Sequence, residues 1–497
     1  MADASLMELG ALPVAPTPEK IEWGEVQRLV LSGYPKLVHA RFLLLRVEDP
    51  AKARAWVKTL VEENLVRFGW GERHHLTPAM AVAFTWDGFT ALGVDEKTLD
   101  GFSPEFVEGM TALGRPRKFG DTAESAPSEW VWGVDAWTPH ALLAVYAADE
   151  PALARTVARE IARLESSGLS LLTGRGGEEL GRSRPLDDRR EHFGFADGLS
   201  QPRFKDEPGG RRSKTVHEAD KIAAGELLLG YENEAELFPR SPVISPALAA
   251  RAPFPRKDGD LGRNGSYLVY RQLEQDVGAF WKAMGALGES PSVEDRVYLA
   301  SKIVGRWPDG APLVTKPSPN EPGARDLEAF DYAHDDPDGL KCPFGSHIRR
   351  SNPRATLARD PDMGLAKSKK HRLLRRGRPY GEPFVPSMAP ADLAAAADGG
   401  TGAPGERGIH FLCFNADIAN QFEFVQQTWT NGPIFQGLHG EVDPLVGDPA
   451  PTGGLYSIPC EPFRKRIHGL PRFVKVRGGA YFFAPSRTAL LYLSSIV

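Results

Sequence analysis

The sequence of 497 residues is poor in cysteine and lacks long apolar runs, and each shortage excludes a class of protein. Its three cysteines, Cys342, Cys413 and Cys460, are odd in number and widely spaced, which argues against a disulfide framework and indicates a reducing compartment. No apolar run reaches the roughly 18 residues that span a bilayer. The first 22 residues hold one Lys, no Arg and three Pro, unlike a signal or transit peptide. We therefore expect a cytoplasmic protein.

The balance of charge excludes further classes of partner. The chain has 60 Lys and Arg against 65 Asp and Glu, a formal net charge of −5, which is too even for a dedicated nucleic-acid or membrane-surface protein. We therefore expect neither nucleic acid nor a membrane as a partner. A CxxCH motif is also missing, so any haem would not be attached as in c-type cytochromes.

What the sequence does have is the composition of an ordinary globular protein, with 41% hydrophobic and 25% charged residues. At roughly 150 residues per domain, the length allows about three domains or two enlarged ones. Compact apolar runs suited to buried strands recur, and each is followed by apolar residues at helical spacing. The predicted strand-helix units begin at 42–47, 142–147, 266–270 and 409–414.

Two more apolar runs, at 80–85 and 480–483, add a strand to each half. Because two strand-helix-strand units make a ferredoxin-like domain, we predict an α+β protein with two domains of this type. In the helix after 142–147, helical spacing predicts a buried face made of Leu153, Val157, Ile161 and Leu164.

Long connections rich in Pro and Gly separate these units, at 239–265, 305–345 and 377–407. Loops of this length usually build functional sites. The stretch 349–378 holds eleven Lys or Arg against two Asp. It is either a solvated basic loop or a cradle for an anionic ligand.

Three short segments carry groups that chemistry needs, and the first two also have structural interpretations. Asp197 stands between Phe195 and Gly198 and is either a general acid-base or half of an Asp-Gly turn. His347 stands among arginines and is either a haem or metal ligand or a hydrogen-bonded structural residue. Arg375 keeps its charge when buried, so it can stabilise negative charge in a dry site.

Together and in this order, the three segments resemble the dye-decolourising peroxidase family. Gly194 to Gly198 is similar to its G-x-x-D-G signature, His347 to the histidine of C-P-x-x-x-H-I-R-R-x-N-P-R, and Arg375 to the arginine of R-x-x-x-P-Y-G. The resemblance implies two ferredoxin-like domains of the duplicated dimeric α+β barrel type with long loop insertions. We place the N-terminal domain at 23–215, ending in the Asp197 loop, and the haem-binding domain at 216–497.

The resemblance also implies a cofactor and a reaction. Haem b would be bound without a covalent link, with His347 as the ligand of its iron. Hydrogen peroxide would be reduced through a ferryl intermediate, and small reducing substrates such as dyes or phenols would be oxidised. Asp197 would move the peroxide proton and Arg375 would stabilise charge as the O–O bond breaks.

Weaker matches concern the surroundings of the haem. Asp443 resembles the carboxylate partner of the ligand histidine, although an Asp-Pro turn explains it equally well. Arg350 is a candidate partner for a haem propionate, with Arg349 or Arg354 as alternatives. Gly377 stands where some family members carry a third distal polar side chain, and the basic insert 367–372 could alter access to the haem.

Two other functions are consistent with parts of the sequence. A haem-binding or haem-handling protein on the same scaffold would show little turnover, although the presence of both Asp197 and Arg375 favours the enzyme. A metal-dependent hydrolase would use the loop from His334 to Gly339, but this loop lacks the oxygen-ligand spacing of a hard-cation site.

Overall fold

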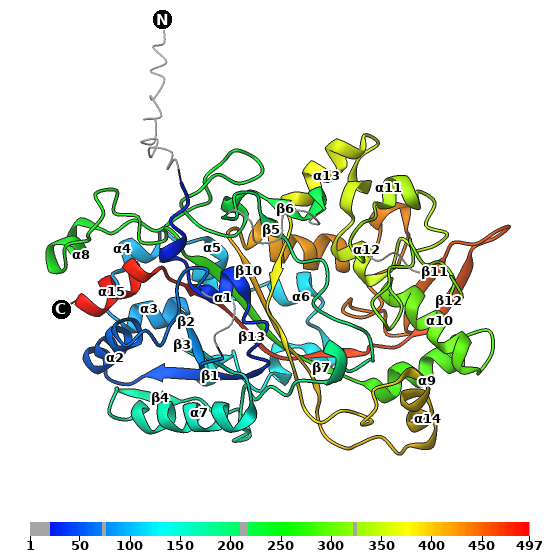
Figure 1. The fold of residues 1–497 in the computed structure, drawn as a ribbon, viewed down its shortest axis with the longest axis horizontal. Coiled ribbons are helices and arrows are strands. Elements are labelled where there is room, and N and C mark those ends of the chain that lie inside the picture. The colour runs from blue at the N-terminus through cyan, green and yellow to red at the C-terminus, as the bar shows by residue number, and fades with distance from the viewer. Residues whose placement is uncertain (1–19, 72–75, 209–216, 322–325, 497) are drawn as a thin grey trace, which may run out of the picture.

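The computed structural model describes residues 20–71, 76–208, 217–321 and 326–496 (Figure 1). Its centre is a nine-stranded sheet with the order β4-β1-β3-β2-β13-β7-β10-β8, in which β9 also pairs with β10. All of these pairings are antiparallel. Within the described ranges, no helix is both long and apolar enough to cross a membrane.

The N-terminal half of the sheet confirms the predicted alternation of strands and helices. It consists of β1 (His39–Val47), α2 (Pro50–Glu62), β2 (Ala79–Phe84), α3 (Trp86–Ala91), β3 (Ala141–Ala147), α7 (Glu150–Leu164) and β4 (Leu169–Leu171). The two long helices begin alike. The carboxylate of Asp49 accepts hydrogen bonds from the first amides of α2, and that of Asp149 accepts one from Ala152 N, which satisfies donors that have no partner inside the helix.

The C-terminal half repeats the arrangement. It consists of β7 (Ser266–Gln275), α9 (Val277–Leu287), β8 (Leu374–Arg375), β9 (Arg378–Tyr380), β10 (Gly408–Asn415), the π-helical turns η9 (Ala419–Glu423) and η10 (Val425–Thr430), β13 (Val474–Ala484) and α15 (Arg487–Ser495). With the first half, this makes the two ferredoxin-like α+β units that we predicted. The predicted boundary at 215/216 lies outside the described residues.

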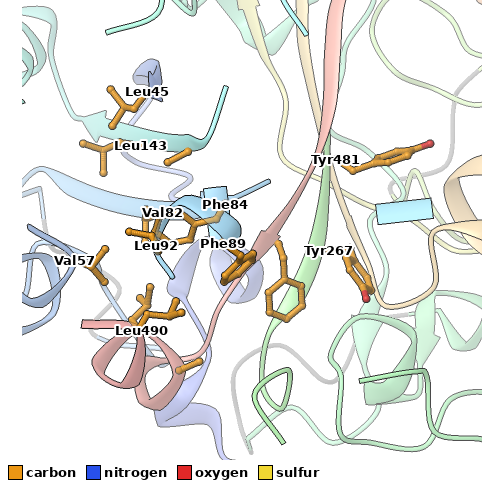
Figure 2. Close-up of a cluster of buried hydrophobic side chains, with 14 of the residues drawn as sticks. Leu45, Val57, Val82, Phe84, Phe89, Leu92, Leu143, Tyr267, Tyr481 and Leu490 are labelled. Atoms are coloured by element: carbon orange, nitrogen blue, oxygen red, sulfur yellow. The ribbon is translucent and has the colours of Figure 1, made fainter. Parts of the chain in front are cut away.

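The halves meet at β2 and β13, where Phe84 pairs with Phe483. The ring of Phe483 lies 5.1 Å from that of Phe102 and 5.2 Å from that of Tyr267, so both halves share one hydrophobic cluster. Figure 2 shows part of this cluster, including Phe84 and Tyr267. The final helix α15 packs against α2 of the other half (Figure 1), so the two halves are also in contact through these helices.

The predicted buried face of α7 is wrong at Ile161, and Val157 is only partly buried against the core. Ile161 is 38% exposed, whereas Glu160 is 1% exposed and pairs with Arg159 Nε at 3.1 Å and Arg163 Nη1 at 3.8 Å. The buried residues are Leu153, Thr156, Glu160 and Leu164. Ile161 lies one residue, about 100° of helix rotation, beyond that face.

The remaining elements lie at the sheet edges and in the long connections. They are α1 (Arg28–Ser32), α4 (Glu96–Leu99), α5 (Pro104–Glu108), α6 (Arg115–Phe119), β5 (Arg203–Phe204), β6 (Lys221–Ile222), α8 (Pro246–Arg251), α10 (Val293–Val304), α11 (Tyr332–Asp335), α12 (His347–Ser351), α13 (Pro361–Lys369), α14 (Pro390–Gly399), β11 (Gly454–Ile458) and β12 (Lys465–Leu470). The connection 377–407 is therefore partly helical, and its α14 packs against α9.

Candidate active site

A cavity of about 570 Å³ lies on one face of the C-terminal half of the sheet. Alternate residues of three strands line it, because successive side chains in a strand point to opposite faces. These residues are Arg271, Leu273 and Gln275 of β7, Ile409 and Phe411 of β10, and Val474 and Val476 of β13. The volume falls within the range of roughly 300–1,000 Å³ that is usual for ligand and cofactor sites.

His347 lines this cavity from the first position of α12, and its ring is held by Asp443. His347 Nδ1 donates to Asp443 Oδ2 over 2.9 Å. The other oxygen, Asp443 Oδ1, accepts from Leu445 N at 2.9 Å and Val446 N at 3.0 Å. With Nδ1 occupied as a donor, Nε2 of the neutral ring is left as the atom that can bind a metal.

Asp443 is fully buried and the side chain of His347 is 27% exposed, and each group shifts the pKa of the other. Burial alone would lower the pKa of His347, but the charge of Asp443 and its hydrogen bond outweigh burial and raise it. Burial alone would raise the pKa of Asp443, but the charge and hydrogen bond of His347 and the N–H of Val446 outweigh burial and lower it. Asp443 is therefore an ionised carboxylate, and its hydrogen bond to the ring N–H increases the electron density of the imidazole.

Asp197 and Arg375 line the same cavity. Arg375 Nη1 lies 3.8 Å from Asp197 Oδ1, and the two side chains are 36% and 47% exposed. Arg375 is also held by the chain that follows Asp197, because Nη2 donates to Leu199 O over 2.6 Å and its backbone N donates to Gln201 Oε1 over 2.9 Å. The fold thus brings together a carboxylate and a guanidinium from distant parts of the sequence.

The two glycines around Asp197 shape its loop. Gly194 and Gly198 have φ of 94° and 79°, which favour glycine. A Cβ on Gly194 would lie 2.7 Å from Leu393 Cδ1. The hydrogen-bonded turn of this loop lies at residues 191–194, where Gly194 N donates to Glu191 O over 2.9 Å, and the chain after it places Asp197 on the cavity wall.

Arg350 lies outside the described lining of the cavity. It is fully buried, and its guanidinium donates to Trp429 O at 2.6 Å, Gly432 O at 3.2 Å and Glu441 O at 2.7 Å. Arg349 is likewise engaged, with Asp336 Oδ2 at 3.0 Å. The hydrogen bonds of these two arginines connect α12 to the neighbouring segments of the chain.

Arg354, in contrast, lines the cavity from a buried position. Its Nη1 donates to Phe330 O at 2.8 Å and its Nη2 lies 3.3 Å from Glu328 Oε2. From the insert 367–372, Arg372 also reaches the wall and pairs with Asp220 at 2.7 Å. Gly377 lines the cavity without a side chain.

Sequence reasoning missed two polar residues on the wall, Glu191 and Gln201. Both lie within four residues of the Gly194–Gly198 motif, in which the sequence analysis predicted a role only for Asp197. Gln201 bonds the backbone of Arg375, and Glu191 bonds two amides of the loop before Asp197. A polar side chain next to a glycine-rich motif was the available signal.

The residues of the cavity fit haem. Its described lining has ten arginines against three acids, Asp121, Glu191 and Asp197, which suits an anionic cofactor. In the part of the chain that the structure describes, no group of three or more His, Cys, Asp or Glu could hold a metal ion by itself. Iron bound to His347 would therefore need its other ligands from a cofactor, as haem provides.

The chain is similar to known peroxidases. No protein-family profile matches the chain. It is 30% identical over 475 residues to the multifunctional dye peroxidase DyP2 of an Amycolatopsis species, covering 91% of each chain. It is 28% identical over 443 residues to the dye-decolorizing peroxidase msp1 of Mycetinis scorodonius, covering 84% of this chain and 77% of the relative.

Solved structures share the fold. A decolorizing peroxidase from Auricularia auricula-judae superimposes with a TM-score of 0.74 at 24% identity, covering 95% of this chain and 100% of the other. A dye-decolorizing peroxidase in complex with 2,6-dimethoxyphenol gives a TM-score of 0.73 at 23% identity, covering 96% and 100%. The chain belongs to the dye-decolourising peroxidase family and is an enzyme of the peroxidase class.

Proposed function

We propose that the chain is a haem b peroxidase that uses the 570 Å³ cavity to reduce hydrogen peroxide. One observation carries the proposal. His347, with its Nε2 left free by the bond to Asp443, lines the same cavity as the Asp197–Arg375 pair. A metal-binding imidazole, a proton acceptor and a fixed positive charge therefore share one site.

His347 would hold the iron of haem through Nε2, and Asp443 would increase the electron donation of the ring by accepting a hydrogen bond from Nδ1–H. Arg354 is the arginine that we assign to a propionate, because it reaches the cavity and Arg350 is engaged elsewhere. When bound, haem supplies the redox-active iron at which peroxide is reduced to water.

Asp197 is proposed to accept a proton from the oxygen of hydrogen peroxide that binds, and to return it to the oxygen that leaves as water. Arg375 donates hydrogen bonds from a fixed position and would stabilise negative charge on the leaving oxygen. Reduction of one peroxide to two waters takes up two electrons and two protons, so two one-electron donors are oxidised in each cycle.

The electron donors that we propose are phenols and dyes. One relative is named a multifunctional dye peroxidase, and one solved structure of a related fold holds 2,6-dimethoxyphenol. We also propose a cytoplasmic location, supported by the free thiols of Cys342, Cys413 and Cys460. A domain boundary near 215 is supported by the separation of β1–β4 from β7–β13 into two halves of the sheet.

Haem titration of the wild type and of His347→Ala tests the proposal. The wild type should bind one equivalent with a Soret band and oxidise 2,6-dimethoxyphenol only with peroxide, whereas His347→Ala should lose both. The matched control is His334→Ala, because His334 is 69% exposed and lies off the cavity. A Soret band in the wild type without peroxide-dependent oxidation would favour the haem-handling alternative, and an unchanged His347→Ala would refute the ligand.

A further inference from the structure

The loop that carries Asp197 is closed by a partly buried glutamate, Glu191. Within residues 189–198, here called the Asp197 loop, Glu191 Oε2 accepts from Phe193 N and Glu191 Oε1 accepts from Phe195 N, both over 2.9 Å. The backbone repeats the closure, since Glu191 N donates to Phe195 O over 2.9 Å. The two oxygens of one carboxylate therefore fix the amides of Phe193 and Phe195, which shortly precede Asp197 in the chain.

The same carboxylate joins the loop to the sheet. Gln275, the last residue of β7, donates from Nε2 to Glu191 Oε2 over 2.7 Å. Phe193 stacks on Phe280 of α9 with ring centroids 4.5 Å apart, which buries this side of the loop in the core. Glu191 thus receives three N–H donors, two from its own loop and one from the strand that lines the cavity.

The next two residues of the loop, Ala196 and Asp197, are also held by backbone hydrogen bonds. Ala196 N donates to Pro308 O over 3.0 Å, and Asp197 N donates to Arg189 O over 2.9 Å. With only Ala196 between the bonded amide of Phe195 and Asp197, a displacement of the loop at Phe195 is transmitted to the catalytic carboxylate.

Glu191 is also close enough to Asp197 for their charges to interact. Burial raises the pKa of Glu191 to about 7, against the effect of its three hydrogen bonds, and the negative charge of Asp197 raises it further. Both carboxylates line the same cavity. Withdrawing a carboxylate from water costs free energy, and the hydrogen bonds that Glu191 accepts from its loop offset part of this cost.

We propose that Glu191 is a positioning residue for the peroxide reaction, which holds the proton-accepting oxygen of Asp197 in place over the cavity. The proposal rests on the role proposed for Asp197. Without the carboxylate, the buried amides of Phe193 and Phe195 and the Gln275 side chain would lack an acceptor, so the loop would rearrange to satisfy them.

Glu191→Gln in the haem-loaded, full-length chain tests this inference. The substitution keeps the shape but replaces one acceptor oxygen with a donor. The matched control is Glu178→Gln, because Glu178 also accepts from an amide of its own loop, Gly176 N at 2.8 Å, and lies away from the cavity. Asp197→Asn is measured alongside.

Three readouts are expected to change in Glu191→Gln and not in the control. Amide hydrogen exchange of the peptide covering 189–199 becomes faster. The second-order rate constant with hydrogen peroxide falls about 10-fold, since misplacement by 1 Å can cost up to roughly 100-fold, while the KM for 2,6-dimethoxyphenol stays unchanged. Cyanide binding weakens by a similar factor, because hydrogen cyanide must give its proton to a base when it binds iron as the anion.

The outcomes separate this inference from the proposed function. If Asp197→Asn is impaired and Glu191→Gln reacts like Glu178→Gln, Glu191 does not position Asp197 and the proposed function stands. If Asp197→Asn itself reacts like the wild type, the proposed role of Asp197 fails. If Glu191→Gln does not fold, Gln275→Met decides in its place: slower peroxide reaction and weaker cyanide binding support the inference, and unchanged values overturn it.

Discussion

The two polar pairs of the cavity are built differently. The His347–Asp443 pair is joined at 2.9 Å and Asp443 has no exposed side-chain surface, whereas Asp197 and Arg375 lie 3.8 Å apart with side chains 47% and 36% exposed. The first pair is suited to hold an imidazole in one orientation. The second pair is about half exposed on the cavity wall, so both of its groups can contact a small molecule that enters the cavity.

The largest expected effect comes from removing the carboxylate of Asp197, the proposed base. Asp197→Asn keeps the size of the side chain but cannot accept a proton, so the rate constant with hydrogen peroxide should fall by about 10²–10⁴-fold. Stopped-flow measurement of the Soret change after mixing with peroxide gives this constant. Haem affinity should stay at the wild-type level. A loss of both haem affinity and the rate with peroxide would mean that Asp197 and His347 do not act independently.

Removing the positive charge should have a somewhat smaller effect. Arg375→Met loses the guanidinium that donates to Leu199 O and faces Asp197, and loss of one charge-stabilising donor typically slows a reaction by about 100-fold or more. The same stopped-flow assay applies. Arg350→Met is the matched control, because Arg350 lies off the cavity, and an equal loss of rate in both variants would contradict the assignment of Arg375.

Asp443→Asn, which changes the partner of His347, should lower the affinity for haem more than the rate of the reaction with peroxide. Loss of the carboxylate that orients a ligand histidine typically weakens metal binding by about 10–100-fold. Transfer of haem to an excess of apomyoglobin measures the change. Asp336→Asn, which removes a buried carboxylate paired with Arg349 at 3.0 Å, should leave haem affinity unchanged even if the protein becomes less stable.

The smallest effect on activity is expected from Glu226, a buried carboxylate that forms no ion pair among the described residues. Burial raises the pKa of Glu226 to about 8, with Glu234 and Asp417 adding to the rise, in contrast to the lowered pKa of Asp443. A folded-state pKa above the unfolded value of roughly 4.5 means that stability is lost as pH rises from about 5 to 8.

Glu226→Gln removes that titration. Between pH 5 and pH 8 the free energy of unfolding, measured with urea, should fall less in Glu226→Gln than in the wild type. The exposed Glu236→Gln serves as the control and should follow the wild type. A pH dependence in Glu226→Gln identical to that of the wild type would show that Glu226 ionises normally in the folded protein.

Local sequence patterns predicted most of the fold because they report on short-range physics. Apolar runs followed by an acidic cap and helical spacing identified β1 with α2 and β3 with α7. The same approach was wrong about Ile161, because the buried position is taken by Glu160, whose carboxylate pairs with the exposed Arg159 and Arg163, and an apolar pattern cannot anticipate a buried acid.

Motif resemblance led to Asp197, His347 and Arg375, and the structure places all three on one cavity. It also led to Asp443, which lies 96 residues from His347 in the sequence and is bonded to it. It did not identify which arginine of 349–354 faces the cavity, because the direction of a side chain on a short helix depends on the segments packed around it.

The sequence by itself determined the order of strands and helices, the long connections and the residue types available for catalysis, since these depend on neighbours a few positions apart. Only the tertiary structure decided that Arg354 rather than Arg350 reaches the cavity and that Glu191 closes the Asp197 loop. Those outcomes depend on how the loops pack against β7 and around α12, and such long-range contacts leave no local pattern in the sequence.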